Sequence, residues 1–281
     1  MKNKIYIYIL AFFVLNIIVV NFSFARDSRK RLSTIATDFT NLSDIEAEIR
    51  FGRELAARIL GNYRILDDEK INRYVNLVGR ALTLYAGRPE IKYHFAVLDS
   101  DEINAFATPG GYIFVTKGTL MKMDNEAQLA AVLGHEIAHV VRKHVVKELN
   151  IKGDDVSAAG GIASMIGGAT GSFREALDQA LDEAADILFN KGYKVADEIE
   201  ADRIGILLAS IAGYDPSALK QFLNSARSFE KEDKTYKKGE HPIQEVRIRE
   251  INKTLEANGL QDITKAKAEE RFHETIRSEN K

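Results

Sequence analysis

The stretch AAVLGHEIAHVV, residues 130–141, places two histidines four residues apart around a glutamate within an apolar run. Positions i and i+4 of a helix lie on one face, so His135 and His139 would point the same way if this stretch is helical. The flanking leucines and valines predict that the helix is buried. Buried imidazole and carboxylate groups need partners, because unpaired polar groups in an apolar interior destabilise a protein by several kcal/mol. The stretch is therefore either part of a metal site or a set of polar core residues.

The spacing matches the His-Glu-x-x-His arrangement, in which two imidazole nitrogens hold one zinc ion. Glu136 directly follows His135, so its side chain would point to the neighbouring direction around the helix. From there its carboxylate would reach a zinc-bound water without being a ligand, and it would act as the general base on that water. The motif thus predicts two metal ligands, His135 and His139, and one base.

A catalytic zinc ion takes three protein ligands and keeps one position open. The chain contains no cysteine, so the third ligand must be a histidine, an aspartate or a glutamate. A strong helical pattern over residues 193–213 carries Glu198 and Asp202 four residues apart and hence on one face. One of the two would be the ligand, and the other would accept a hydrogen bond from a histidine N–H. The alternative is an ordinary charged helix face.

Composition bounds the class of protein. Of 281 residues, 45% are hydrophobic and 28% are charged, which is typical of a globular protein. The formal net charge is −2, so nothing points to a nucleic acid as partner. The absence of cysteine excludes a thiol nucleophile and a zinc site built on thiolates.

The first 25 residues differ from the rest. A short basic start, MKNK, precedes an apolar run that ends in the small residues Ser23 and Ala25. This pattern predicts a signal peptide over residues 1–25, cleaved before Arg26. The alternative is an uncleaved anchor, because the run approaches the ~20 apolar residues of a spanning helix. In both cases the remainder is exported, and the bacterial periplasm is the expected compartment.

Periodicity and turn signals predict a mostly helical α+β protein. We expect a flexible lead-in over residues 26–42, one domain over residues 43–262 and a charged, solvated tail over residues 263–281. Helices are expected at 43–61, 68–85, 125–149, 173–188, 193–213, from 215 onward, and at 241–259, and strands at 93–99 and 111–116. The glycine-rich segment 158–171 is either a mobile loop over a cleft or a helix contact.

Four segments occur together in a familiar order: NAFATPGGYIFVTKGTL (104–120), LAAVLGHEIAHVVRKH (129–144), EIEADRIG (198–205) and HPIQEVR (241–247). In order and spacing they resemble the HtpX/BepA/CAAX-prenyl-endopeptidase type of zinc metallopeptidase, over roughly residues 43–255. The chain is most similar to a compact, soluble, periplasmic branch of that family. The resemblance implies a zincin-like domain with a small β-sheet beside the His-Glu-x-x-His helix, and one zinc ion per chain. It also implies that Glu198 is the third ligand and that Asp202 supports the site.

The same resemblance places His241 and Arg247 near the cleft. They would either help to bind the oxyanion of the tetrahedral intermediate, or His241 would occupy the fourth zinc position and hold the enzyme latent. A third alternative is that His241 only caps a helix. By its spacing, His144 faces away from the ligand pair and is expected at the surface, and Glu200 is expected to be solvated.

The implied activity is hydrolysis of peptide bonds in unfolded or misassembled cell-envelope proteins, in association with the membrane or the envelope assembly machinery. An exposed edge of the strand Gly111, Tyr112, Ile113, Phe114 and Val115 would bind an extended substrate by β-augmentation. The alternative is a latent or chaperone-like binding module with a closed or structural zinc site. His241 and the glycine-rich segment are the features that allow this alternative.

Overall fold

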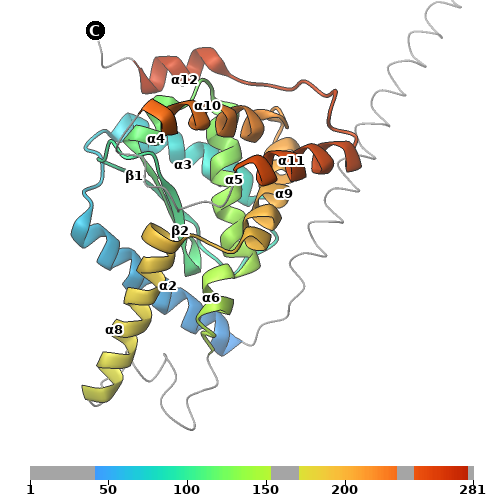
Figure 1. Ribbon diagram of the computed structural model, residues 1–281. Coiled ribbons are helices and arrows are strands. Elements are labelled where there is room, and N and C mark those ends of the chain that lie inside the picture. The colour runs from blue at the N-terminus through green and yellow to red at the C-terminus, as the bar shows by residue number, and fades with distance from the viewer. Residues whose placement is uncertain (1–41, 153–170, 233–243, 278–281) are drawn as a thin grey trace, which may run out of the picture.

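A computed structural model describes residues 42–152, 171–232 and 244–277 (Figure 1). The predicted signal peptide, the lead-in up to residue 41, residues 158–170 of the glycine-rich segment and His241 lie outside these ranges. Within them, no helix is long and apolar enough to cross a membrane. The elements are α2 (Leu42–Asn62), α3 (Glu69–Thr83), β1 (His94–Leu98), β2 (Ala105–Thr108), η1 (Pro109–Gly111), β3 (Tyr112–Thr116), α4 (Lys117–Lys122), α5 (Glu126–Arg142), α6 (His144–Glu148), α8 (Gly171–Asp186), η3 (Ile187–Lys191), α9 (Val195–Ile211), α10 (Ala218–Glu232), α11 (Gln244–Ala257) and α12 (Glu269–Ile276).

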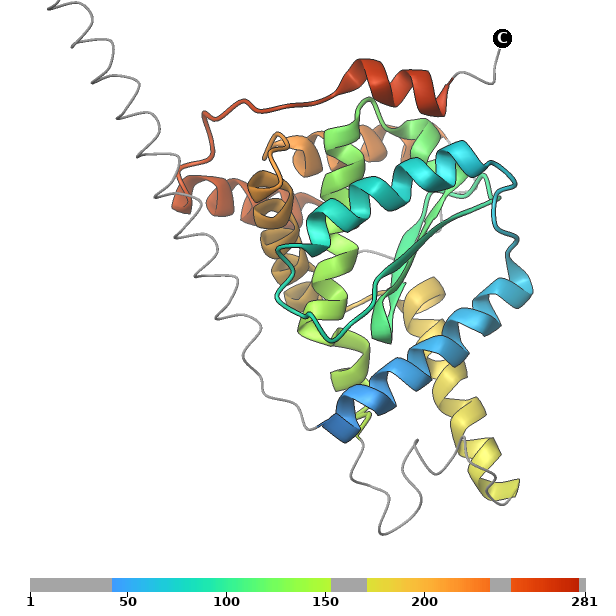
Figure 2. The same ribbon diagram turned by 180° about the vertical axis from the view of Figure 1, so that it is seen from behind.

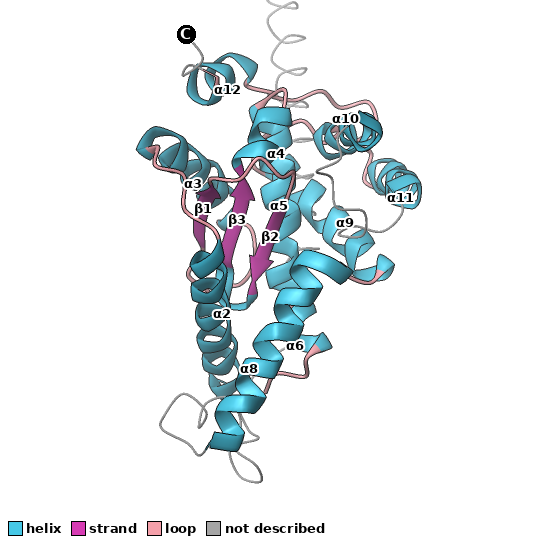
Figure 3. Cartoon of the chain, turned by 60° about the vertical axis from the view of Figure 1, so that its left-hand side comes forward, coloured by secondary structure: helices cyan, strands magenta, loops and turns pink. Residues whose placement is uncertain are grey.

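A three-stranded mixed sheet lies among the helices in the order β1-β3-β2, with β1 parallel and β2 antiparallel to β3. Successive side chains of a strand point to opposite faces. Val97 and Val115 join the core formed with α3 and α5, whereas Phe106 and Phe114 face the core formed with α2 and α8. Figure 3 shows the strands between these helices. The predicted mostly helical α+β fold with a small sheet is confirmed.

The predicted substrate strand does not have a free edge. Residues 112–116 form β3, the central strand, which pairs with β1 on one side and β2 on the other. The expectation of an exposed edge over Gly111–Val115 is therefore wrong. Residues 105–108, which directly precede the TPGG turn, form the strand β2 and occupy one side of β3. This strand lies at the sheet edge next to α5.

The helix α5 runs through the centre of the molecule and is buried from Glu126 to Val141. It begins where the sequence predicts, since the Asn125 side chain accepts a hydrogen bond from the backbone N–H of Gln128. α3 crosses it on the side seen in Figure 2. The expected continuation to residue 149 is wrong, because Lys143 adopts a left-handed conformation (φ 58°) that ends α5 and starts the separate helix α6.

We expected residues 263–281 to form a solvated tail, but part of this segment is folded and buried. Residues 269–276 form α12, whose Phe272 and Ile276 are buried in the same core as α3 and α5. Arg271 of α12 donates two hydrogen bonds to the buried carboxylate of Glu126, which also accepts from the hydroxyls of Tyr74 and Tyr214. The folded part therefore extends to the end of α12.

Replacing Arg271 by methionine is expected to lower the free energy of unfolding by about 1–3 kcal/mol at pH 7, because a charged donor to a buried carboxylate is lost. Burial raises the pKa of Glu126, but the Arg271 and tyrosine hydrogen bonds outweigh burial and hold this pKa below its ordinary 4.5. Such a group contributes stability above its ordinary pKa and loses that contribution as the pH falls through the folded value. Urea unfolding at several pH values measures this effect. The difference in free energy of unfolding between the variant and wild type should become smaller below about pH 4.5.

The matched control is Arg53→Met, which removes an exposed arginine from α2 and should change stability by less than about 0.5 kcal/mol. An equal loss for Arg271→Met at pH 7 and at pH 3 would contradict the proposed role of the Glu126 carboxylate.

Candidate metal centre

The helices α5 and α9 cross in direct backbone contact at two glycines. A Cβ atom added to Gly205 would lie 2.6 Å from the backbone nitrogen of His135, and one added to Gly134 would lie 2.9 Å from the Gly205 carbonyl oxygen. No side chain fits at either position, so the two helices approach more closely than ordinary helices do. The crossing point lies directly beside His135, and it brings the His-Glu-x-x-His motif of α5 against the carboxylates of α9.

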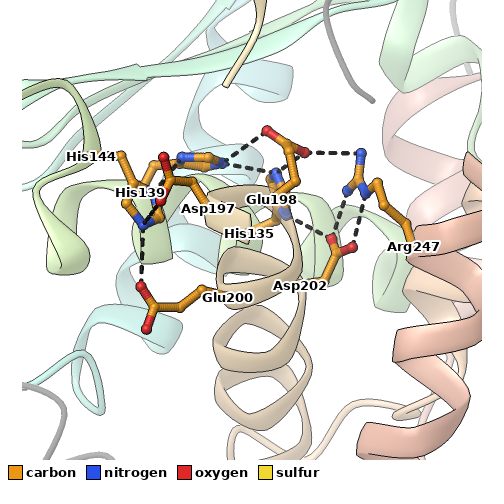
Figure 4. Close-up of polar contacts among 8 residues, drawn as sticks. All are labelled: His135, His139, His144, Asp197, Glu198, Glu200, Asp202 and Arg247. Atoms are coloured by element: carbon orange, nitrogen blue, oxygen red, sulfur yellow. Dashed lines mark hydrogen bonds and ion pairs between the residues drawn. The ribbon is translucent and has the colours of Figure 1, made fainter. Parts of the chain in front are cut away.

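Three buried side chains meet at this crossing (Figure 4). The Nε2 atoms of His135 and His139 are 3.0 Å apart. The two carboxylate oxygens of Glu198 divide between these nitrogens: Oε2 lies 3.5 Å from the Nε2 of His135, and Oε1 lies 3.5 Å from the Nε2 of His139. One ligand atom from each residue lies within 4.8 Å of the other two. The structure thus brings together the three residues that the sequence proposed as metal ligands.

The spacing of these atoms fits a tetrahedral ion. Two ligand atoms, each about 2.0–2.1 Å from a tetrahedral zinc ion, lie about 3.4 Å apart. The two histidine nitrogens, 3.0 Å apart, are near this value, and each lies 3.5 Å from a different oxygen of Glu198. The donor set of two imidazoles and one carboxylate also matches the ligands that a catalytic zinc uses in proteins.

Asp202 and Arg247 support this group from the other side. The Nδ1 of His135 lies 2.9 Å from a carboxylate oxygen of Asp202. Arg247 is itself buried; it donates from Nε and one terminal nitrogen to Asp202, at 2.8 and 2.6 Å, and its other terminal nitrogen lies 3.1 Å from Glu198. One guanidinium therefore holds both carboxylates in place. This differs from the oxyanion-binding role expected for Arg247, which stays a prediction.

The charges at the centre favour a divalent cation. Glu136, Glu198 and Asp202 are all buried, and Arg247 is the buried cation among them. Ionised, the three carboxylates exceed the guanidinium by two negative charges. Burial lowers the pKa of His135, but Glu198 and Asp202 outweigh burial and raise this pKa to about 10. Without a metal, His135 is thus held as the protonated partner of the carboxylates, and a metal ion would replace that proton.

His144 has a different position from the one expected. It is only 4% exposed, and its Nδ1 lies 2.8 Å from the Nδ1 of His139. If the Nε2 of His139 faces a metal, its Nδ1 carries the proton and donates it to His144. Burial lowers the pKa of His144, which keeps it neutral and able to accept. A continuous helix would have turned His144 away, and the break at Lys143 returns it to the site.

The outer side of His144 leads to a small charged group. Its Nε2 is 3.3 Å from Glu200 and 3.7 Å from Asp197. Glu200 also pairs with Arg142 at 2.9 Å, so the expectation of a solvated Glu200 is wrong. The ring of Tyr193 stacks on His139 with centroids 3.9 Å apart. These contacts hold His139 from the side opposite Asp202, and no pattern in the sequence indicated them.

Glu136 lies beside the ligands but is not one of them. Together with His135 and Arg247 it lines a cavity of about 60 Å³ between β2, α5, α10 and α11. The predicted base therefore faces a space that a small group can enter. Ala105, the first residue of β2, and the two residues before it line the same cavity, whereas no residue of the central strand β3 lines it.

A comparison with known protein families matches residues 69–255 to peptidase family M48. This range contains the three predicted ligands, the predicted base, Asp202 and Arg247. The chain belongs to peptidase family M48. The resemblance drawn from the sequence motifs is confirmed at this level, and so is the zincin-like fold class.

Several curated proteins are similar to this M48 chain. The beta-barrel assembly-enhancing protease of Escherichia coli (strain K12) is 29% identical over 202 residues, which are 70% of this chain and 41% of that protein. The mitochondrial metalloendopeptidase OMA1 of Schizosaccharomyces pombe is 29% identical over 197 residues, covering 69% of this chain and 53% of that protein. The chain thus spans about half or less of the length of these relatives.

Replacing His144 by alanine is expected to weaken zinc binding by about 10–100-fold, because His139 loses the acceptor that fixes its ring and its proton. The measurement is a competition titration against a chromophoric chelator. His144→Asp should restore part of the affinity, because aspartate also accepts a hydrogen bond. His94→Ala, which removes an exposed histidine from β1, is the control and should leave the affinity unchanged. Equal affinities for His144→Ala and wild type would contradict this role.

Proposed function

We propose that this M48 chain is a zinc-dependent endopeptidase that hydrolyses peptide bonds of unfolded or misassembled cell-envelope proteins. The observation that carries the proposal is the meeting of His135, His139 and Glu198 with one ligand atom from each within 4.8 Å of the others, and with Glu136 lining the cavity next to His135. Membership of a metallopeptidase family supports the same reaction class.

His135, His139 and Glu198 would hold one zinc ion per chain. When bound, zinc supplies Lewis-acid chemistry, because it acidifies a coordinated water and polarises a carbonyl. Asp202 holds the proton of His135 at Nδ1 and so keeps Nε2 available as a donor to the ion. His144 does the same for His139, and Arg247 fixes the two carboxylates of α9.

Glu136 moves the protons in this proposal. Its carboxylate lines the cavity one residue from His135, where a substrate carbonyl would be attacked by water. The carboxylate accepts a proton from the attacking water and then delivers it to the nitrogen of the departing peptide. Burial of Glu136 strengthens its interaction with the charges that develop during the reaction.

The outer edge of β2 replaces β3 as the proposed binding edge for an extended substrate. β2 pairs with β3 on one side, and among the described residues no strand pairs with its other side. Its first residue, Ala105, lines the cavity that Glu136 also lines. Backbone pairing at such an edge reads little side-chain sequence, which suits unfolded proteins as substrates.

The envelope role rests on two further observations. The N-terminal sequence has the pattern of a signal peptide, which supports export to the periplasm. The printed name of the Escherichia coli relative refers to assembly of β-barrels. We therefore propose misassembled envelope proteins as substrates and the envelope assembly machinery as a partner.

Replacing Glu136 by glutamine is expected to reduce casein degradation by about 10²–10⁴-fold, because the variant loses the proton acceptor. Zinc content should stay at one ion per chain, because Glu136 is not a ligand. The control is Glu256→Gln, an exposed position on α11 that should leave both quantities unchanged. Undiminished degradation by Glu136→Gln would show that the assigned base is wrong. Full zinc content with no degradation by wild type would instead favour the latent or chaperone-like alternative.

A further inference from the structure

The cavity beside Glu136 has an apolar wall that the proposed chemistry does not use. Four side chains of α10 form this wall at helical spacing: Leu219, Phe222, Leu223 and Ala226. Positions i, i+3, i+4 and i+7 form one face of a helix. Val132 of α5, Ala105 of β2 and the partly buried Ile103 before β2 complete the apolar lining, and all of these residues except Ile103 are less than 10% exposed.

Polar residues line the cavity as well. They are His135, Glu136, Arg247, Gln244 at the start of α11, Asn104 and Thr119. The side-chain oxygen of Gln244 is buried and has no hydrogen-bond partner within the described ranges. A buried amide oxygen beside an apolar space is suited to accept a hydrogen bond from the backbone N–H of a bound peptide.

We propose that this cavity receives the side chain of one residue next to the cleaved bond, that it accepts small and medium aliphatic side chains, and that Phe222 sets the upper size limit. The inference rests on the proposed function and names the substrate preference of the same site. Glu136 and His135 both line this cavity, so a peptide whose carbonyl lies beside Glu136 can place a neighbouring side chain in it.

The size of the cavity decides which side chains fit. Its volume of about 60 Å³ is well below the roughly 150 Å³ of an apolar cavity that holds a benzene ring. Alanine, valine and leucine side chains would be accepted, and aromatic rings would be excluded unless the wall moves. An apolar pocket of this kind discriminates by about 10–200-fold for each methylene group.

The first test is cleavage of a mixed peptide library, with the products identified by mass spectrometry. Wild type should show alanine, valine or leucine at one fixed position next to the cleaved bond, at least about tenfold over phenylalanine. Phe222→Ala should admit phenylalanine and tyrosine at that position. Ala226→Leu narrows the cavity from the same wall and should restrict the position to alanine and glycine. Leu77→Ala, at an exposed position on α3, is the control and should not change the preference.

The second test needs no catalysis. Two zinc-loaded proteins are compared, Glu136→Gln and the double variant Glu136→Gln with Phe222→Ala. Isothermal titration calorimetry measures the affinity of each for two peptides that differ only in carrying leucine or phenylalanine at the central position. The single variant should prefer leucine, and the double variant should lose or reverse the preference. Equal binding of both peptides by both proteins would overturn the pocket assignment.

The two tests separate the possible failures. Cleavage without any preference, unchanged by Phe222→Ala, would overturn the pocket and leave the proposed peptidase function intact. A leucine preference in binding without cleavage by wild type would support the pocket and overturn the peptidase function.

Discussion

The contact between α5 and α9 at Gly134 and Gly205 determines the distance between the two halves of the metal centre. Neither position has room for a Cβ atom, because each glycine lies against the backbone of the other helix. The close approach allows Glu198, a short side chain on α9, to reach both histidines of α5. A wider crossing would leave the histidine pair without a third ligand. The buried charges, the cavity and the proposed chemistry all depend on this spacing.

Burial of so many charged groups at the crossing is tolerated because each has a partner. Arg247 holds Glu198 and Asp202 together, and Asp202 in turn holds His135. Removing one member of such a buried group leaves an uncompensated charge, which typically destabilises a protein by about 3–5 kcal/mol. The excess of negative charge that remains is what a divalent cation would neutralise. The same contacts therefore serve the stability of the crossing and the binding of the ion.

The sequence alone was sufficient for the local part of this centre. Histidines at i and i+4 must share a face of any helix, and Asp202 at four residues from Glu198 follows the same rule. The choice of Glu198 as ligand came from the resemblance to a family, since helical spacing left the two carboxylates of α9 equivalent. The helical spacing and the family motif both describe residues that are close in the sequence. For such residues the relative positions of the side chains follow from the helix itself.

Other features were beyond sequence reasoning because they depend on contacts between distant segments. The single left-handed residue Lys143 turns the chain so that His144 returns to His139, and lysine carries no signal for that conformation. The order β1-β3-β2 depends on pairing between strands, and it moved the free edge from β3 to β2. The burial of α12 depends on Glu126, about 145 residues earlier in the chain, which a charge-rich tail does not indicate.

The most direct test of the central claim is an anomalous diffraction map, measured at the zinc absorption edge, of crystals of the zinc-loaded protein. The account predicts one strong peak per chain, about 2.0–2.2 Å from the Nε2 atoms of His135 and His139 and from one carboxylate oxygen of Glu198. A fully occupied zinc at any other group of residues, with no peak between these three side chains, would contradict it.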